Sequence, residues 1–225
     1  MFLSKKSVTF AVSALAMLCS GAAFAKEAPQ AHKAVELSIL HINDHHSYLE
    51  PHEARINLNG QQTKVDIGGF SAVNGKLYEL RKKYKNPLVL HAGDAITGTL
   101  YFTLFGGSAD AAVMNAGNFH YFTLGNHEFD AGNEGLLKLL EPLKIPVLSA
   151  NVIPDKNSIL YNKWKPYDIF TVDGEKIAII GLDTVNKTVN SSSPGKDVKF
   201  YDEIATAQIM ANALKQQDIN KIILL

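Results

Sequence analysis

The chain has 225 residues, of which 46% are hydrophobic and 20% are charged, and its formal net charge is zero. This length and balance are typical of one sizeable globular domain with a buried core. The lack of a basic excess argues against a nucleic-acid polymer as partner, and the lack of an acidic tract argues against a disordered chain.

Residues 1–25 have the pattern of a secretory signal peptide. Two lysines precede an apolar run that is short for a membrane span, and a small-x-small signal ends at Ala25. An uncleaved anchor is the alternative, but the cleavage pattern favours a periplasmic or secreted chain without stable membrane insertion. Cleavage removes Cys19, the only cysteine, and this excludes thiolate metal sites and cysteine nucleophiles. A polar spacer, 26–34, then leads to the domain, 35–225.

The first part of the domain alternates apolar runs with helical patterns. Residues 35–42 predict a buried strand, and the apolar stripe in 68–84 predicts a helix with a basic last turn. Residues 86–94 predict a second strand that ends in a glycine turn. A short helix is expected at 108–118.

The next segments continue the alternation. A third strand is predicted at 121–126, a helix at 134–143 and a fourth strand at 145–153. Residues 167–184 predict a hairpin that turns at Asp173-Gly174.

The last segments follow the same scheme. Residues 186–197 are rich in Ser, Asn and Gly and predict a loop. A helix is expected at 203–217 and a strand at 219–225. The sequence therefore predicts an α/β fold with mostly parallel strands covered by helices. Because ligand sites lie beyond the carboxyl ends of parallel strands, the end of the sequence at a strand suggests a fragment of a longer protein.

Three of the predicted strands end in polar groups that could carry chemistry. Asp44 and His46 follow the first strand, Asp94 follows the second, and Asn126, His127 and Asp130 follow the third. The carboxyl ends of parallel strands point the same way, so these side chains can converge. Oxygen and imidazole ligands suit Zn²⁺, Mn²⁺ or a similar ion.

Each of these residues also has an ordinary structural interpretation. Asp44 could form an Asx turn, and Gly93-Asp94 is a common turn pair. Glu128 could be a solvated carboxylate at a helix start, and Asp130 could cap the helix that follows. His45 is expected to support neighbouring ligands or to be exposed. The ordered combination of three polar strand ends is more specific than any single residue.

This ordered set resembles the calcineurin-like metallophosphoesterases, whose signature is D-x-H, then G-D, then G-N-H-[ED], each after a strand. The stretches "HINDHHS", "LVLHAGDAITG" and "TLGNHEFDAG" resemble most closely the secreted 5′-nucleotidase and 2′,3′-cyclic phosphodiesterase branch. The resemblance covers the whole stretch after the signal peptide. It implies a metallophosphoesterase-like layered fold.

The resemblance also implies roles for matched residues. Asp44 and His46 would bind the first of two divalent ions, Asp94 would bridge both ions, and Asn126 would bind the second. His127 would stabilise the transition state or protonate the leaving group. Asp130 would orient His127 as a His–carboxylate dyad.

The family's remaining metal ligands and a C-terminal nucleotide-binding domain would lie beyond Leu225. Zinc is the expected metal, with manganese or cobalt as alternatives, and a nucleotide such as NAD or AMP is the expected substrate. The implied activity of the whole protein is a 5′-nucleotidase with NAD pyrophosphatase activity. The alternatives are a thiosulfohydrolase of the same superfamily and an inactive fragment, and the 225-residue chain is expected to be weakly active or inactive.

Overall fold

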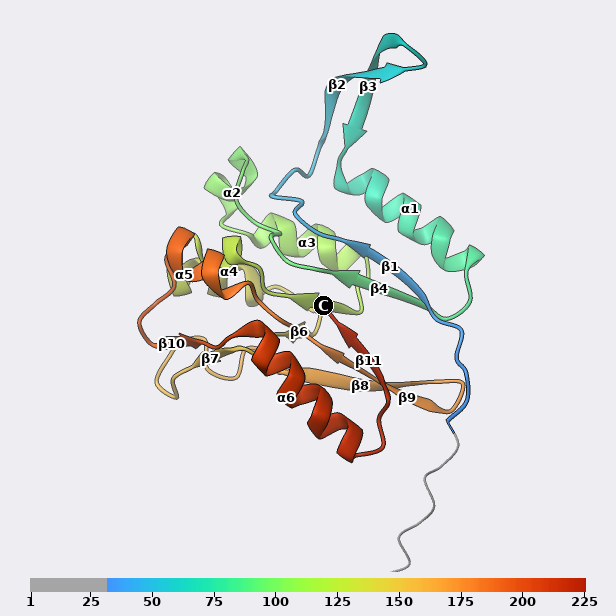
Figure 1. Cartoon of the computed structure of the whole chain (residues 1–225). Helices are drawn as coiled ribbons and strands as arrows, with labels where there is room; N and C mark the ends of the chain where they lie inside the picture. Colours follow the sequence, from blue (N-terminus) through green and yellow to red (C-terminus); the bar gives the residue numbers. More distant parts are fainter. Residues whose placement is uncertain (1–31) are drawn as a thin grey trace, which may run out of the picture. The chain divides into compact units, whose positions relative to one another are not determined.

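A four-stranded parallel sheet is the central element of the computed structural model, which describes residues 32–225. Its strands, in order across the sheet, are β1 (Ser38–Ile42), β4 (Pro87–His91), β5 (Tyr121–Thr123) and β6 (Val147–Leu148) (Figure 1). Ile42 lies opposite His91, and His91 lies opposite Phe122. Because all neighbouring strands are parallel, their carboxyl ends lie along one edge of the sheet.

A second sheet has the strand order β11–β9–β8. Its strands are β8 (Tyr167–Val172), β9 (Glu175–Ile180) and β11 (Lys221–Leu224). The predicted hairpin is confirmed, since β8 and β9 are antiparallel and are joined by Asp173 and Gly174, with φ of 50° and 87°. Two positive φ values are what a two-residue hairpin turn requires. A separate antiparallel pair joins β7 (Val152–Pro154) to β10 (Val198–Phe200).

Six α-helices and one 3-10 helix surround these strands in the described residues. They are α1 (Phe70–Lys83), α2 (Leu100–Phe105), α3 (Ser108–Ala116), η1 (Asn126–Phe129), α4 (Gly132–Leu140), α5 (Val185–Ser191) and α6 (Glu203–Gln216). No helix among residues 32–225 has the length and apolar character needed to cross a bilayer. The predicted signal peptide lies outside the described residues.

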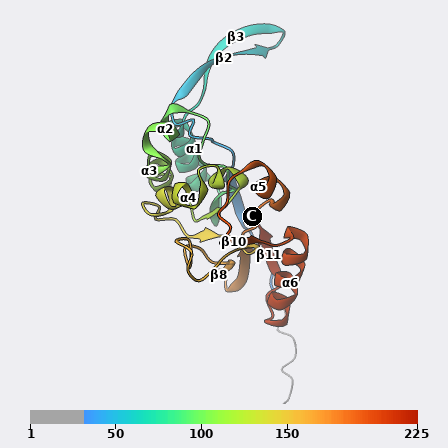
Figure 2. The same ribbon diagram turned by 90° about the vertical axis from the view of Figure 1, so that its left-hand side faces the viewer.

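The buried residues divide the fold into layers. Helices α1, α3 and α4 pack on one face of the parallel sheet, where Phe70, Met114 and Leu136 join one apolar cluster. The other face packs on the second sheet, where Leu90 and Ile179 share a cluster. Helix α6 covers the far side of the second sheet (Figure 2).

The predicted α/β class with helices on the outside is confirmed, and the structure adds a second sheet between the helix layers. The sequence of β4 explains why both faces of the parallel sheet are covered. Val89 points to the helix side, whereas Leu88 and Leu90 point to the second sheet, and all three are buried. A strand that is buried on both faces reads as a continuous apolar run.

The structure contains a hairpin that the sequence analysis does not predict. Strands β2 (Pro51–Leu58) and β3 (Gln61–Gly68) pair antiparallel, with Leu58 opposite Gln61. Asn59 and Gly60 form the turn with φ of 52° and 86°. An Asn-Gly pair between alternating residues is a strong hairpin signal, so this element was predictable.

The prediction of a loop over 186–197 is wrong for its first half. Residues Val185–Ser191 form α5, and Thr188 within it is fully buried. Its hydroxyl donates to the Asp183 carboxylate at 2.7 Å, and this hydrogen bond joins the helix to the segment that follows β9. This tertiary contact outweighs the weak helix propensity of Asn, Thr and Val.

Candidate metal centre

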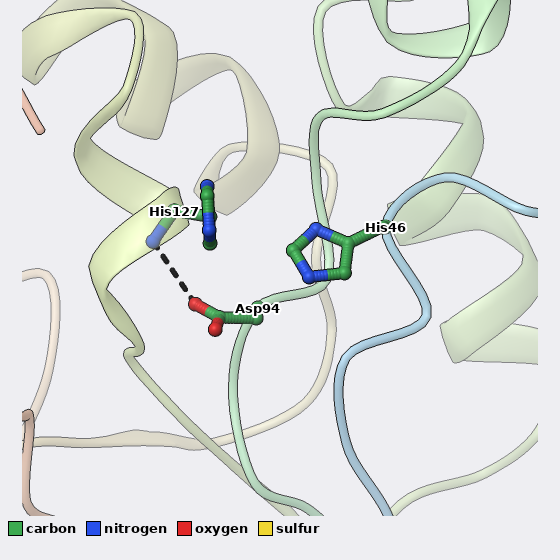
Figure 3. Close-up of side chains that lie close together, drawn as sticks. All are labelled: His46, Asp94 and His127. Carbon is green, nitrogen blue, oxygen red and sulfur yellow. Dashed lines mark hydrogen bonds between the residues drawn. The ribbon is translucent and has the colours of Figure 1, made fainter. Parts of the chain in front are cut away.

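The loops after β1 and β4 remain hydrogen bonded after the strands end. The backbone nitrogens of Asp44 and His46 donate to the carbonyl oxygens of Gly93 and Asp94, at 3.0 and 3.2 Å. The loop after β5 joins them, because the backbone nitrogen of His127 donates to Asp94 Oδ1 at 2.9 Å (Figure 3). Three segments far apart in the sequence thus meet at one edge of the sheet.

Three side chains from these loops offer donor atoms to one point. One imidazole nitrogen of His46, one carboxylate oxygen of Asp94 and one imidazole nitrogen of His127 all lie within 4.8 Å of one another. His46 Nδ1 donates to the carbonyl oxygen of Ile96 at 3.2 Å, so its Nε2 is free to act as a ligand. Of this group, the His46 imidazole and the Asp94 carboxylate fit a divalent ion such as Zn²⁺, and the His127 imidazole lies beside them.

The other predicted ligands border this group. Asp44 is exposed, and its Oδ1 lies 3.6 Å from His46 Nε2. Its other oxygen accepts a hydrogen bond from the Asn43 side chain. Asn126 is buried at the start of η1, directly before His127.

The environment of Asp94 favours a nearby cation. Burial raises the pKa of Asp94, and the charge of Asp44 raises it further, whereas the His127 backbone N–H lowers it. A half-buried carboxylate that is repelled by a second carboxylate gains stability when positive charge lies nearby.

Two glycines allow the loops to approach closely. Gly93 has φ of 90°, and a Cβ there would lie 2.8 Å from the backbone nitrogen of Gly125. A Cβ on Gly125 would collide with the Asp94 carboxylate. The glycines of "HAGD" and "LGNH" are therefore required by contact between the two loops.

His127 belongs to a hydrogen-bonded chain of three side chains. Its Nδ1 lies 2.7 Å from Asp130 Oδ2, and Ser192 Oγ donates to Asp130 Oδ1 at 2.8 Å. Burial alone would lower the pKa of His127, but the hydrogen bond and charge of Asp130 and the charges of Asp94 and Glu128 raise it. With Nδ1 bonded to Asp130, Nε2 is the nitrogen available for other contacts.

The structural interpretation of Asp130 as a helix cap is wrong. Helix α4 begins after Ala131 and has no side-chain cap, since both Asp130 oxygens bind other partners. Ser192 lies within the segment predicted as a loop. Its pairing with Asp130 spans 62 residues and leaves no local sequence signal.

Glu128 is not the solvated carboxylate that the sequence suggests. It is fully buried, and its carboxylate accepts backbone N–H groups of Asp94, Ala95 and Gly125 at 2.9, 2.7 and 2.7 Å. Burial and the charge of Asp94 raise the pKa of Glu128 to about 7, although these N–H groups lower it. This residue of the "GNHE" motif holds two loops together.

A further buried carboxylate follows the end of β9. Asp183 is 1% exposed and accepts the Thr188 hydroxyl. Burial raises the pKa of Asp183 to about 6, and the charge of Asp94 adds to this effect. The side chain of Asn151 forms two hydrogen bonds with the backbone of Asp183. Its Nδ2 donates to the Asp183 carbonyl oxygen at 2.8 Å, and its Oδ1 accepts the Asp183 N–H at 2.9 Å. Asp183 was not predicted from the sequence, although an aspartate three residues after an apolar strand is a visible signal.

Comparisons with known proteins found similar sequences and solved structures. Residues 37–224 match the family model of the calcineurin-like phosphoesterases. The chain is 93% identical over 225 residues to a NAD 5′-nucleotidase of Haemophilus influenzae, covering all of this chain and 37% of that protein.

Two solved structures are also similar. The structure of Haemophilus influenzae NAD nucleotidase matches with a TM-score of 0.84 and 97% identity, over 86% of this chain and 34% of that one. A 5′-nucleotidase precursor from Thermus thermophilus matches with a TM-score of 0.76 and 37% identity, over 84% and 36%. The chain thus spans about a third of the length of the relatives that it matches.

Proposed function

This chain belongs to the calcineurin-like phosphoesterase family, and on that basis we propose that it is the metal-binding part of a nucleotide phosphohydrolase. The observation that carries the proposal is the convergence of His46, Asp94 and His127 from three separate loops within 4.8 Å. Imidazole and carboxylate groups at the carboxyl edge of a parallel sheet suit a bound divalent ion and a phosphate ester.

We assign the metal-binding roles as follows. Asp44 and His46 would hold a first ion, Asp94 would contact both a first and a second ion, and Asn126 would hold the second. The 3.6 Å distance between Asp44 Oδ1 and His46 Nε2 supports a shared ligand site. The hydrogen bond from His46 Nδ1 to the Ile96 carbonyl oxygen also supports this site, because it fixes the ring of His46 and leaves Nε2 free.

His127 acts as the catalytic residue beside the ions. Its Nε2 faces the reacting phosphate and stabilises the transition state or protonates the leaving group. Asp130 holds the ring in one orientation through Nδ1 and favours its protonated form, in agreement with the raised pKa of His127. When bound, the ions supply positive charge to the phosphate and acidify a water molecule for attack on phosphorus.

The relatives suggest the substrate class. NAD and AMP are the proposed substrates of the whole protein, because the 93% identical relative is named a NAD 5′-nucleotidase. We propose zinc as the metal, with manganese or cobalt as substitutes. A periplasmic or secreted location is proposed from the signal-like sequence of residues 1–25.

Metal-dependent hydrolysis tests this function. The purified chain is incubated with Zn²⁺ or Mn²⁺ and with AMP or NAD, and the products are separated by chromatography. We expect slow turnover, at a small fraction of the rate of the whole Haemophilus influenzae enzyme, because the chain covers 37% of that protein. Asp94→Ala and chelation should each abolish turnover. Hydrolysis that survives Asp94→Ala would refute the assignment.

A further inference from the structure

A buried chain of polar side chains lies behind the loop that carries Asp44 and His46. His45 lies between them in sequence, and its Nε2 is 3.0 Å from Asp110 Oδ1 on α3. Its Nδ1 is 2.8 Å from Nε2 of His91 at the end of β4. The side chain of His45 is 8% exposed, and His91 and Asp110 are fully buried.

The donors and acceptors in this chain can be assigned from its chemistry. A carboxylate only accepts, so His45 Nε2–H donates to Asp110. His45 Nδ1 then accepts from His91 Nε2–H. Burial and the neighbouring His45 lower the pKa of His91 well below its usual value, in agreement with a neutral ring. Asp110 Oδ2 has no hydrogen-bond partner among the described residues. Among these residues, His45 is therefore the sole side chain that is hydrogen bonded to Asp110, through Oδ1.

The backbone around His45 needs such an anchor. Asp44, His46 and Ser47 have φ of 53°, 44° and 54°. This left-handed conformation is disfavoured for residues with a Cβ, and it persists only where surrounding contacts impose it. The His45 ring also lies edge-on to Phe70, with centroids 4.7 Å apart.

We propose that His45 is a positioning residue for the metal centre, acting through Asp110 and His91. The buried ring fixes the left-handed loop from its middle, so that the flanking side chains of Asp44 and His46 face one divalent ion. This inference rests on the proposed function, because it needs Asp44 and His46 to be ligands. It adds residues of β4 and α3 that contact no ligand atom and lie outside the family motif.

Two substitutions at His45 separate hydrogen bonding from packing. His45→Phe keeps an aromatic ring of similar size and loses both hydrogen bonds. His45→Gln retains an N–H near the position of Nε2 and can still donate to Asp110. His41→Phe is the matched control, because His41 is exposed on the preceding strand.

The measurement is a Co²⁺ titration of the purified chain, followed by visible absorption, which reports ligand geometry as well as affinity. Groups that orient ligands typically contribute 10–100-fold to metal affinity. We therefore expect His45→Phe to weaken Co²⁺ binding by about 10-fold or more and to change the spectrum. His45→Gln should recover most of the affinity, and His41→Phe should match the wild type.

The outcomes distinguish this inference from the proposed function. A folded wild-type chain that binds no Co²⁺ refutes both. If the wild type binds, unchanged affinity and spectrum in His45→Phe refute the positioning role alone, as does a folded His45→Gln without recovery. Should His45→Phe fail to fold by circular dichroism, Asp110→Asn decides. Weaker binding supports the role, and unchanged binding overturns it.

Discussion

Glu128 Oε2 lies 2.9 Å from the backbone nitrogen of Asp94 and joins the loop of Asp94 to the loop of Asn126. The same oxygen accepts the backbone N–H of Gly125 at 2.7 Å, and Oε1 accepts that of Ala95 at 2.7 Å. One buried side chain therefore sets the distance between two proposed metal-binding segments. Their relative position depends on a residue that has no proposed metal contact.

We predict that Glu128→Gln destabilises the chain and weakens metal binding. The amide has one acceptor oxygen, so at least one of three buried N–H groups loses its partner, at a cost of about 1–3 kcal/mol. Urea unfolding measures the loss, and Zn²⁺ titration measures the affinity. Glu134→Gln on the exposed surface of α4 is the control and should change neither. Equal stability of the two variants would contradict the role of Glu128.

We predict that Glu128 makes the metal-free chain less stable as the pH rises from about 4.5 to 7. Burial raises the pKa of Glu128 from 4.5 to about 7, so in this range the folded chain binds more protons than the unfolded chain. The stability that Glu128 contributes is fully present below its pKa in the unfolded chain. It is lost as the pH rises through its pKa in the folded chain. The change is on the order of 3 kcal/mol. Urea midpoints across this range should fall less in Glu128→Gln than in the wild type.

We predict that Zn²⁺ raises the melting temperature of the wild type and not that of Asp94→Asn. A ligand at 100 times its Kd stabilises the folded state by about 2.7 kcal/mol. Asn at position 94 removes the charge that would lie between two ions but keeps the side-chain shape. Calorimetry with and without Zn²⁺ measures the shift, and Asp168→Asn on β8 is a control outside the site. An equal shift in Asp94→Asn would argue against a bridging role.

We predict a graded loss of turnover for substitutions at Asp130 and Ser192, the two residues that support His127. Asp130→Asn removes the charge that orients His127 and should lower kcat about 100-fold or more, because the general acid–base contribution of His127 depends on that charge. Ser192→Ala removes one neutral hydrogen bond, worth about 1 kcal/mol, and should lower kcat a few-fold with little change in KM. Steady-state AMP hydrolysis measures both.

Ser193→Ala is the control for the serine variant, because Ser193 is exposed and next in sequence. If it lowers kcat as much as Ser192→Ala does, the effect belongs to the loop and not to the Asp130 contact.

The sequence predicts features that depend on local pattern, and it misses those that depend on distant partners. The ends of β1, β4 and β5 were predictable because apolar runs stop at polar residues, and parallel pairing then brings the ends together. The burial of Glu128 was not, because its partners Asp94 and Ala95 lie more than 30 residues away. Thr188 likewise turns a loop-like sequence into α5 through Asp183.

The two sheets contribute unequal parts of the site. Asp130 follows β5 of the parallel sheet, whereas Ser192 lies in the segment after β9 of the second sheet. A change in how the two sheets pack would therefore move Ser192 relative to Asp130, whereas the loops of His46 and Asp94 both follow strands of the first sheet. The carboxylate that orients His127 is thus itself held by a hydroxyl from the segment that follows the second sheet.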